Sequence, residues 1–243
     1  MTSLDLTLPT PAENLALDEV LLESAETGSG GESLRFWESP TPFVVVGYAN
    51  KIATEVGAEA CATLGVPIFR RCSGGGTVVQ GPGCLNYTLV LRIADTGPTR
   101  NVTSTNRFVM ERNRTALASL IGASGADGSV VQVRGHTDLA IGALKFSGNS
   151  QRRRKRFLLF HGTMLYAFDL ALVDRLLKFP SQQPDYRDGR AHREFITNLN
   201  LPAPTVKQAL ADVWSATEVM RHPPEIPAEL LRKYQSAAWN RKF

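Results

Sequence analysis

The chain has 243 residues, of which 43% are hydrophobic and 21% are charged, and its formal net charge is +4. This balance is typical of a globular protein with one sizeable core, and no run approaches the roughly 18 apolar residues of a membrane-spanning helix. The N-terminus lacks the pattern of a secretion signal, and three cysteines without a CxxC pair argue against a disulfide framework or a zinc site. We therefore expect a reduced, cytoplasmic protein that does not bind membranes.

The first part of the sequence alternates between helical and strand-like patterns. Residues 11–23 carry apolar side chains at helical spacing, with acidic residues near the start, which predicts a helix. A flexible glycine-rich break follows at residues 28–31. The next predicted elements are two strands and a helix, at residues 34–38, 43–48 and 55–64.

The most distinctive segment runs from Arg70 to Gly76, where two arginines precede a cysteine, a serine and three consecutive glycines. Strand-like residues lead in at 68–71 and out at 86–93, so we expect an antiparallel hairpin with the glycines in its turn. Glycine lets a ligand approach main-chain N–H groups, and arginine suits phosphate or carboxylate. The segment is therefore either a turn that grips an anion or a hairpin turn with solvated arginines. Its spacing matches neither of the two common phosphate loops.

The second half of the sequence predicts more helices and a further set of strands. The predicted helices lie at residues 103–121, 169–179 (capped by Asp169), 205–220 and within 227–243. A strand at 129–133 is expected to run into 134–141 and to pair with 144–150 as a hairpin, before another strand at 157–166. Residues 181–193 are polar and contain proline, which predicts a long loop of the kind that is often functional. The pattern is that of a single α+β domain spanning residues 1–243.

Five consecutive basic residues, Arg152 to Arg156, supply much of the excess positive charge. Such a run is either a solvated face or a contact for an acidic protein partner. No interleaved aromatic pattern or nucleic-acid motif accompanies it, so we expect no nucleic-acid partner.

Short motifs along the chain lie at Asn14–Glu19, Leu34–Trp37, Val45–Asn50, Arg70–Val78, Gly135–Leu139, Lys145–Gln151 and His161–Leu165. In this order they resemble the lipoate–protein ligase and octanoyltransferase family, relatives of biotin–protein ligase. The resemblance covers nearly the whole chain and is most specific at Arg70–Val78. It implies a mainly antiparallel mixed sheet flanked by helices, as in class II aminoacyl-tRNA synthetases and biotin synthetases.

The resemblance also implies a ligase reaction in two steps. The lipoate carboxylate attacks the α-phosphate of ATP, and a lysine of an acceptor lipoyl-domain protein then attacks the resulting lipoyl-AMP. Because charge builds on the phosphate, the reaction needs preorganised cations and N–H groups. The implied cofactors are ATP and Mg²⁺, and lipoate is the implied substrate.

Matching motif positions imply roles for individual residues. Lys145 would neutralise charge between the phosphate and the lipoyl carbonyl, and Asp138 would be a second catalytic residue near Mg²⁺ or the acceptor lysine. The implied nucleotide-binding residues are Arg71, Gly76, Thr77, Val78, Val79, Lys145, Gly148, Asn149 and Thr163. The implied substrate-binding residues are Tyr48, Arg70, Ser73, Gly74, Gly75, Lys145 and His161. Taken alone, Lys145 is equally an ordinary surface lysine, Asp138 a turn cap and His161 a structural histidine.

Two alternative functions stay open at this point. Octanoyltransferases of the family pass the acyl group through a cysteine thioester, but this chain has no cysteine at 179–181 or within 130–142, where the nucleophile is expected. Cys84 would then be a displaced nucleophile. The other alternative is a non-catalytic lipoyl-binding module, against which the retained Lys145 argues. Biotin ligation is disfavoured because the Gly-Arg-Gly-Arg-x-Gly loop of that branch is absent.

The sequence departs from the typical ligase pattern in three places. Gln80–Gly81 stands where ligases carry His–Asp, and Gly135–His136–Thr137–Asp138 replaces Gly-Arg-Asn-Asp. The chain also ends at Phe243, about where a C-terminal accessory domain begins in many ligases. We therefore expect that this domain is absent, and that either a separate accessory subunit supplies its function or the enzyme only transfers preformed adenylate.

Overall fold

The computed structural model describes residues 1–124 and 130–243, and within them eight strands form one large sheet in the order β11-β1-β2-β6-β10-β9-β8-β7. Its strands are β1 (Thr2–Asp5), β2 (Ser33–Trp37), β6 (Cys84–Arg92), β7 (Val131–Arg134), β8 (Asp138–Ile141), β9 (Leu144–Arg153), β10 (Phe157–Leu165) and β11 (Glu218–Val219). All neighbours from β2 to β7 are antiparallel, whereas β1 pairs in parallel with β2 and β11. The predicted mainly antiparallel mixed sheet is confirmed.

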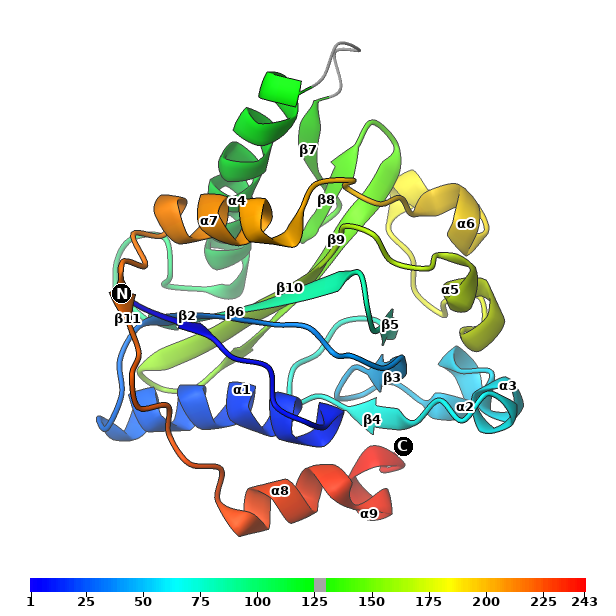
Figure 1. Cartoon of the computed structure of the whole chain (residues 1–243), viewed down its shortest axis with the longest axis horizontal. Coiled ribbons are helices and arrows are strands. Elements are labelled where there is room, and N and C mark those ends of the chain that lie inside the picture. The colour runs from blue at the N-terminus through cyan, green and yellow to red at the C-terminus, as the bar shows by residue number, and fades with distance from the viewer. Residues whose placement is uncertain (125–129) are drawn as a thin grey trace.

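Helices cover both faces of this sheet (Figure 1). Their bounds are α1 (Pro11–Thr27), α2 (Ile52–Glu55), α3 (Ala58–Thr63), α4 (Val102–Ser124), α5 (Ala171–Leu176), α6 (His192–Phe195), α7 (Ala203–Val213), α8 (Ala228–Gln235) and α9 (Ala237–Asn240). Helices α4 and α7 pack on one face, and α1 lies on the other with α8 beside it. None of these described helices has the length and apolar character needed to cross a membrane.

A second sheet consists of β4 (Ile68–Arg70), β3 (Phe43–Val46) and β5 (Val78–Gln80), in that order. The predicted hairpin between strands 68–71 and 86–93 is therefore wrong. Strand β3 lies between β4 and β5, parallel to the first and antiparallel to the second. Residues 71–77 consequently cross the end of β3 instead of turning back on β4, and the Tyr48 N–H donates to the carbonyl of Ser73 at 2.8 Å.

Several other element predictions need correction. The predicted helix 205–220 ends at Val213 in α7, where Ser215 adopts a left-handed φ of 51° and the chain continues into β11. The helix predicted at 55–64 is divided into α2 and α3, because Val56 forms an isolated bridge with Leu177. The strand predicted at 129–141 folds back at Gly135, whose φ is +52°, so β7 and β8 are antiparallel neighbours. Ser129 lies outside the described residues.

The remaining predictions agree with the structure in outline. The helices expected at 11–23 and 103–121 are α1 and α4, and the strand expected at 157–166 is β10. The helix expected at 169–179 is the shorter α5, where the Asp169 carboxylate accepts from the Ala171 N–H at 3.1 Å. The predicted loop 181–193 contains a short 3₁₀ turn, Asp185–Arg187, and the tail contains α8 and α9.

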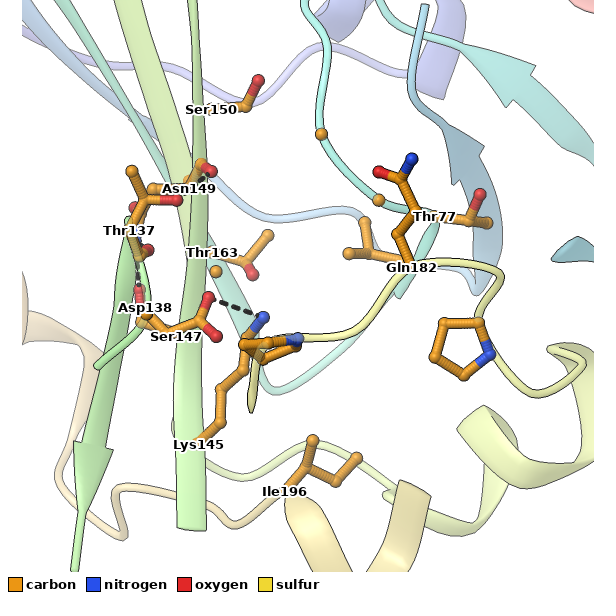
Figure 2. A pocket seen from close by; sticks show the side chains of 18 of the residues that line it. Thr77, Thr137, Asp138, Lys145, Ser147, Asn149, Ser150, Thr163, Gln182 and Ile196 are labelled. Atoms are coloured by element: carbon orange, nitrogen blue, oxygen red, sulfur yellow. Dashed lines mark hydrogen bonds and ion pairs between the residues drawn. The ribbon is translucent and has the colours of Figure 1, made fainter. Parts of the chain in front are cut away.

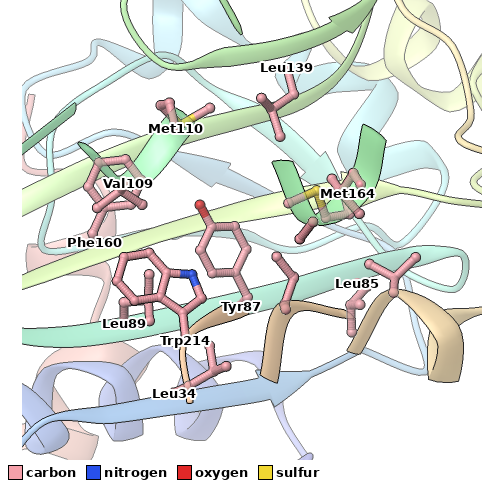
Figure 3. Close-up of a cluster of buried hydrophobic side chains, with 14 of the residues drawn as sticks. Leu34, Leu85, Tyr87, Leu89, Val109, Met110, Leu139, Phe160, Met164 and Trp214 are labelled. Atoms are coloured by element: carbon pink, nitrogen blue, oxygen red, sulfur yellow. The ribbon is translucent and has the colours of Figure 1, made fainter. Parts of the chain in front are cut away.

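The main core lies between the large sheet and the pair α4 and α7. Side chains alternate along β6, so Leu85, Tyr87 and Leu89 enter this core while Val90 faces α1. Figure 3 shows Tyr87 among these apolar side chains, close to Trp214. Its hydroxyl donates to Asn149 at 2.6 Å and accepts from Asn113 at 2.9 Å, so this buried polar group is satisfied.

The contact of β10 with Asn149 leads to a stability prediction. A Cβ on Gly162 would lie 1.7 Å from Asn149 Oδ1. We therefore expect Gly162→Ala to lower the free energy of unfolding by about 2 kcal/mol or more, as overpacking of a filled site does. Chemical denaturation measures this change. The matched control is Gly122→Ala in α4, where an added Cβ meets nothing within 4 Å. This control should be neutral or stabilising, and equal losses in both variants would contradict the prediction.

Candidate active site

An open cavity of about 1590 Å³ lies where the small sheet, the β8–β9 hairpin, β10 and residues 177–196 meet. Thirteen of the residues implicated by the sequence line it: Arg71, Gly74, Gly75, Gly76, Thr77, Val78, Val79, Asp138, Lys145, Gly148, Asn149, His161 and Thr163. In Figure 2, Lys145 reaches toward the middle of this cavity, with Asp138 on one side and Thr77 across from it. The motif Lys145–Gln151 and residues 74–77, which we call the glycine segment, are far apart in sequence but meet at this site.

Lys145 is held by a direct ion pair. Its Nζ lies 2.8 Å from Asp138 Oδ1, and the other carboxylate oxygen of Asp138 accepts from the Tyr186 hydroxyl at 2.9 Å. Gly148 leaves the room that the ammonium occupies, because a Cβ there would lie 2.8 Å from Nζ. About a quarter of the Lys145 side chain is exposed, at 26%. The ammonium is therefore both oriented and accessible from the cavity.

Asp138 by itself does not make a metal site. Both of its oxygens are engaged, and one of them binds a cation. Among residues 1–124 and 130–243, no group of three His, Cys, Asp or Glu side chains could hold a metal ion. The residues present therefore do not fit a Mg²⁺ ion bound by protein side chains alone, and a role for Asp138 beside Mg²⁺ stays a prediction.

Arg71 lies inside the curve of the glycine segment. Its guanidinium donates to the carbonyl oxygens of Gly74 and Gly76, the latter at 2.8 Å, and to the Ser73 hydroxyl at 3.1 Å. Burial lowers the pKa of this guanidinium to about 10. No ion pair joins it to any carboxylate of the described residues. A buried positive charge without a counter-ion at a cavity wall favours an anionic ligand.

The main chain of the same segment supplies further donors. In a trans peptide, the C=O of one residue and the N–H of the next point in opposite directions. Because Arg71 holds the carbonyls of Gly74 and Gly76, the N–H groups of Gly75 and Thr77 point away from its guanidinium. Within the described part of the chain neither N–H has a hydrogen-bond partner, and both residues line the cavity. Successive free N–H groups of this kind bind anions.

Three of the implicated residues lie outside the cavity lining. Arg70 is fully buried and donates to the carbonyls of Gly47, Tyr48 and Asn50, and to the main chain of α9. The ring of Tyr48 packs on Trp239, and its hydroxyl accepts from Lys242. Ser73 is 1% exposed and lies behind the glycine segment, 2.5 Å from His161 Nε2. The structure therefore does not bring these three to the cavity with the others.

The side chain of Asn149 is occupied by its own chain. Its amide donates to the carbonyl of Thr137 at 2.7 Å, and its carbonyl oxygen accepts from Tyr87. Asn149 therefore fixes the turn between β7 and β8, and shapes the cavity rather than offering free donors to it.

The basic run 152–156 finds partners within the chain. Arg152 donates to the carbonyl of Cys72 at 3.0 Å, Arg154 pairs with Glu23, and Arg156 binds Glu26. These contacts fasten the turn between β9 and β10 onto α1. The predicted contact with an acidic acceptor stays untested.

Sequence reasoning missed four residues of the site. Tyr186, Arg134 and Arg187 line the cavity, and so does Asp18 of α1. The Arg187 guanidinium lies between the rings of Phe179 and Phe195, at 5.0 and 4.9 Å from their centroids. For Tyr186 and Arg187 the local signal was the length of the polar loop 181–193, which does not indicate which of its side chains face the site. Asp18 lies in the motif Asn14–Glu19, which gives no sign of its place at the cavity.

With this geometry in hand, the chain can be compared with known proteins. Residues 10–216 match the family described as Lipoyl protein ligase A/B catalytic domain. The chain belongs to this family. The α+β fold is that of lipoate–protein ligases, within the class II synthetase-like group, as predicted.

The relatives of this chain are named either as lipoate-protein ligases or as octanoyltransferases. The chain is 33% identical over 170 residues to "Putative lipoate-protein ligase A" of Aeropyrum pernix, which covers 69% of this chain and 58% of that protein. It is 29% identical over 189 residues to "Octanoyltransferase LipM" of Carboxydothermus hydrogenoformans, covering 72% of this chain and 68% of that one. The chain thus spans less than two thirds of the Aeropyrum relative. It is an enzyme of the lipoate ligase and octanoyltransferase family.

Solved structures agree with this assignment. One is the bi-partite lipoate protein ligase of Thermoplasma acidophilum, studied with its E2 lipoyl domain, at a TM-score of 0.77 and 26% identity; it covers 99% of this chain and 95% of that one. Another is a lipoate-protein ligase A bound with ATP, at a TM-score of 0.76 and 26% identity, covering 99% and 98%.

The cysteines of this family member lead to a chemical prediction. Burial raises the pKa of the Cys84 thiol to about 12 and that of Cys72 to about 11, and neither residue lines the cavity. Because the thiolate is the reactive form, we expect the native protein at pH 8 to react with a thiol reagent only on the time scale of unfolding. All three cysteines should react in denaturant. One thiol that reacts within seconds in the native protein would contradict this expectation.

Proposed function

We propose that this chain is a lipoate–protein ligase. It activates lipoate with ATP to lipoyl-AMP and transfers the lipoyl group to a lysine of an acceptor lipoyl-domain protein. The observation that carries the proposal is the single cavity shared by Lys145, Arg71 and the free N–H groups of the glycine segment. A carboxylate and a triphosphate repel each other, and such positive groups offset that repulsion while holding the two in line.

In the first step, the free N–H groups of Gly75 and Thr77 bind the phosphates, and the buried guanidinium of Arg71, on the other side of the segment, adds its positive charge. Residues Gly76 to Val79 and Thr163 line the nucleotide, and Gly148 keeps open the space beside Lys145. The ammonium of Lys145 neutralises charge at the α-phosphate as the lipoate carboxylate attacks and pyrophosphate leaves. The ATP-bound ligase with the same fold supports ATP as the second substrate.

In the second step, the ε-amine of the acceptor lysine attacks the carbonyl of lipoyl-AMP, and AMP leaves. Lys145 again faces the developing negative charge, now on the carbonyl oxygen. Asp138 keeps the ammonium in place and lies where the incoming amine enters. We assign no step to Mg²⁺. When present, it would be bound by the substrate phosphates together with one or two carboxylates, as is usual for this ion.

The partners follow from the same proposal. The acceptor is a lipoyl domain, and a separate accessory subunit completes the enzyme, which the bi-partite ligase of Thermoplasma acidophilum supports. Residues 1–243 act as one catalytic domain. A cytoplasmic location stays a prediction.

An octanoyltransferase is the second candidate, because relatives carry the name LipM. In that reaction the acyl group comes from a carrier-protein thioester instead of an acyl-adenylate. The family's cysteine intermediate has no counterpart here, since Cys72 and Cys84 are buried with raised pKa values. Direct transfer to the acceptor lysine, assisted by Lys145, would be required. The third candidate, a non-catalytic lipoyl-binding module, leaves the exposed ammonium of Lys145 without a use.

Mass measurement of an acceptor lipoyl domain separates the three candidates. A lipoyl increment that requires ATP supports the ligase. An octanoyl increment from octanoyl carrier protein without ATP supports the transferase, and no increment with either donor supports the binding module. Each reaction is run with and without a candidate accessory subunit.

Lys145→Ala tests the central residue of the proposal. We expect the rate of acyl transfer to fall by at least about 100-fold, the loss typical of removing one preorganised charge donor. Gly148→Ala should have a similar effect while leaving the ammonium present, because the added Cβ would displace Nζ. Gly31→Ala, outside the cavity lining and with nothing within 4 Å of the added Cβ, is the control for the added methyl group. Unchanged transfer in Lys145→Ala would remove the assignment.

Tyr186→Phe tests how Lys145 is held. The hydroxyl of Tyr186 donates to Asp138, so its loss frees the carboxylate that orients the ammonium. We expect kcat to fall about tenfold with KM nearly unchanged, in line with one hydrogen bond to a charged group. Tyr166→Phe is the matched control. The Tyr166 hydroxyl also donates to a carboxylate, that of Glu38 at 2.9 Å, and neither residue lines the cavity. Equal losses in both variants would show a general stability effect instead.

A further inference from the structure

A row of polar side chains crosses the large sheet on the face covered by α1. Arg35 of β2 lies opposite Thr88 of β6, Thr88 lies opposite His161 of β10, and His161 lies opposite Ser150 of β9. Because residues paired across neighbouring strands share a face, these four side chains form one line. Helix α1 places Asp18 against this line.

One contact joins Asp18 to Arg35, and two more connect it through His161 to Ser73, which precedes the glycines. Asp18 Oδ1 lies 2.6 Å from Arg35 Nη1, and Asp18 Oδ2 lies 3.4 Å from His161 Nδ1. On its other side, His161 Nε2 lies 2.5 Å from the Ser73 hydroxyl. Asp18, His161 and Ser73 therefore form a continuous hydrogen-bonded relay.

The charge of Asp18 fixes the direction of the first hydrogen bond in the relay. Burial by itself raises the pKa of Asp18, but Arg35 and His161 together bring it below its usual value, so the carboxylate is an anion that only accepts, and His161 Nδ1 donates to it. In the tautomer that carries its proton on Nδ1 alone, Nε2 accepts from the Ser73 hydroxyl. In either case the Ser73 oxygen accepts from Arg71 Nε at 3.1 Å.

Two members of the row hold the glycine segment. Through His161, Ser73 and Arg71 link the relay to the carbonyls of Gly74 and Gly76. At the end of the row, the Ser150 hydroxyl donates to the carbonyl of Gly74 at 2.8 Å. These contacts turn the N–H groups of Gly75 and Thr77 away from Arg71 and leave them without partners in the described chain.

We propose that Asp18, His161 and Ser73 are positioning residues, which hold the glycine segment in the shape that binds a nucleotide phosphate through the N–H groups of Gly75 and Thr77. This inference rests on the proposed function for the identity of the anion. A Ser–His–Asp sequence of contacts also occurs in enzymes with a serine nucleophile. Here Ser73 is 1% exposed, does not line the cavity, and has a lone pair taken by Arg71.

Binding of ATP to the intact chain, measured by titration calorimetry without acyl donor or acceptor, tests the relay. We expect Ser73→Ala and His161→Asn to weaken ATP binding about tenfold, because each removes the hydrogen bond between residue 161 and residue 73 beside the glycine segment. His161→Gln should recover part of the affinity, since its amide oxygen reaches the place of Nε2 and accepts from Ser73. Ser39→Ala removes an equally buried hydroxyl, one that donates to Thr41 at 2.7 Å outside the cavity lining, and should leave binding unchanged.

The outcomes separate the relay from the proposed reaction. Loss of ATP affinity in Ser73→Ala and His161→Asn, with thermal unfolding close to that of the native chain, supports the relay even where no lipoyl transfer is seen. Affinity within twofold of the native value in both variants overturns it. A covalent acyl group on Ser73, found by mass after incubation with lipoyl-AMP or an octanoyl thioester and absent in Ser73→Ala, also overturns it, since Ser73 would then be the nucleophile. If Ser73→Ala does not fold, the comparison of His161→Asn with His161→Gln decides alone.

Discussion

The Arg71 guanidinium, held against the carbonyl oxygens of Gly74 and Gly76, is the contact on which the rest of the site depends. A glycine segment by itself has many accessible backbone conformations. This one, which joins β4 to β5 in the sequence, belongs to no strand itself. The guanidinium takes the place of strand pairing, because it donates to the carbonyls of Gly74 and Gly76 on one side of the segment. Since each peptide is planar and trans, the N–H groups that follow these carbonyls point to the opposite side. Burial lowers the pKa of Arg71, and no carboxylate of the described residues pairs with its charge. The guanidinium therefore both shapes the segment and favours an anion at the cavity wall.

Lys145 reaches the cavity from the opposite wall by different means. Its position depends on strand pairing: β8 brings Asp138 opposite Gly148 of β9, and the absence of a side chain at Gly148 leaves space for the ammonium. The loop after α5 adds Tyr186, and the Thr197 N–H donates to the carbonyl of Lys145 itself at 2.9 Å. One wall is therefore fixed by side chain to main chain contacts and the other by sheet register. The two walls are joined where the Ser150 hydroxyl of β9 donates to the carbonyl of Gly74 at 2.8 Å.

Local pattern was enough to predict α1 and α4, because their apolar spacing and, for α1, the capping box of Thr10 and Glu13 are encoded within a few residues. It failed at the glycine segment, since nothing near Arg70 indicates that β3 inserts between β4 and β5. The roles of Arg70 and Ser73 were obscured for the same reason: adjacent residues on a crossing segment point to different parts of the molecule, one toward α9 and one toward His161. Asp18 was within a recognised motif, yet its contact with His161 spans 143 residues and depends on how α1 packs on β10.

The burial of the thiols narrows the chemistry that the site can perform. An acyl group can reach a protein lysine only if its carboxyl carbon carries a good leaving group, either a thiolate or a phosphate. A covalent relay through this enzyme would need a nucleophile in the cavity, and Cys72, Cys84 and Ser73 all lie outside its lining. What the cavity offers instead is positive: an ammonium, a guanidinium without a counter-ion and two free N–H groups. Such groups match the several negative charges of a triphosphate better than the single developing charge of a thiolate, and this difference favours the proposed ligase.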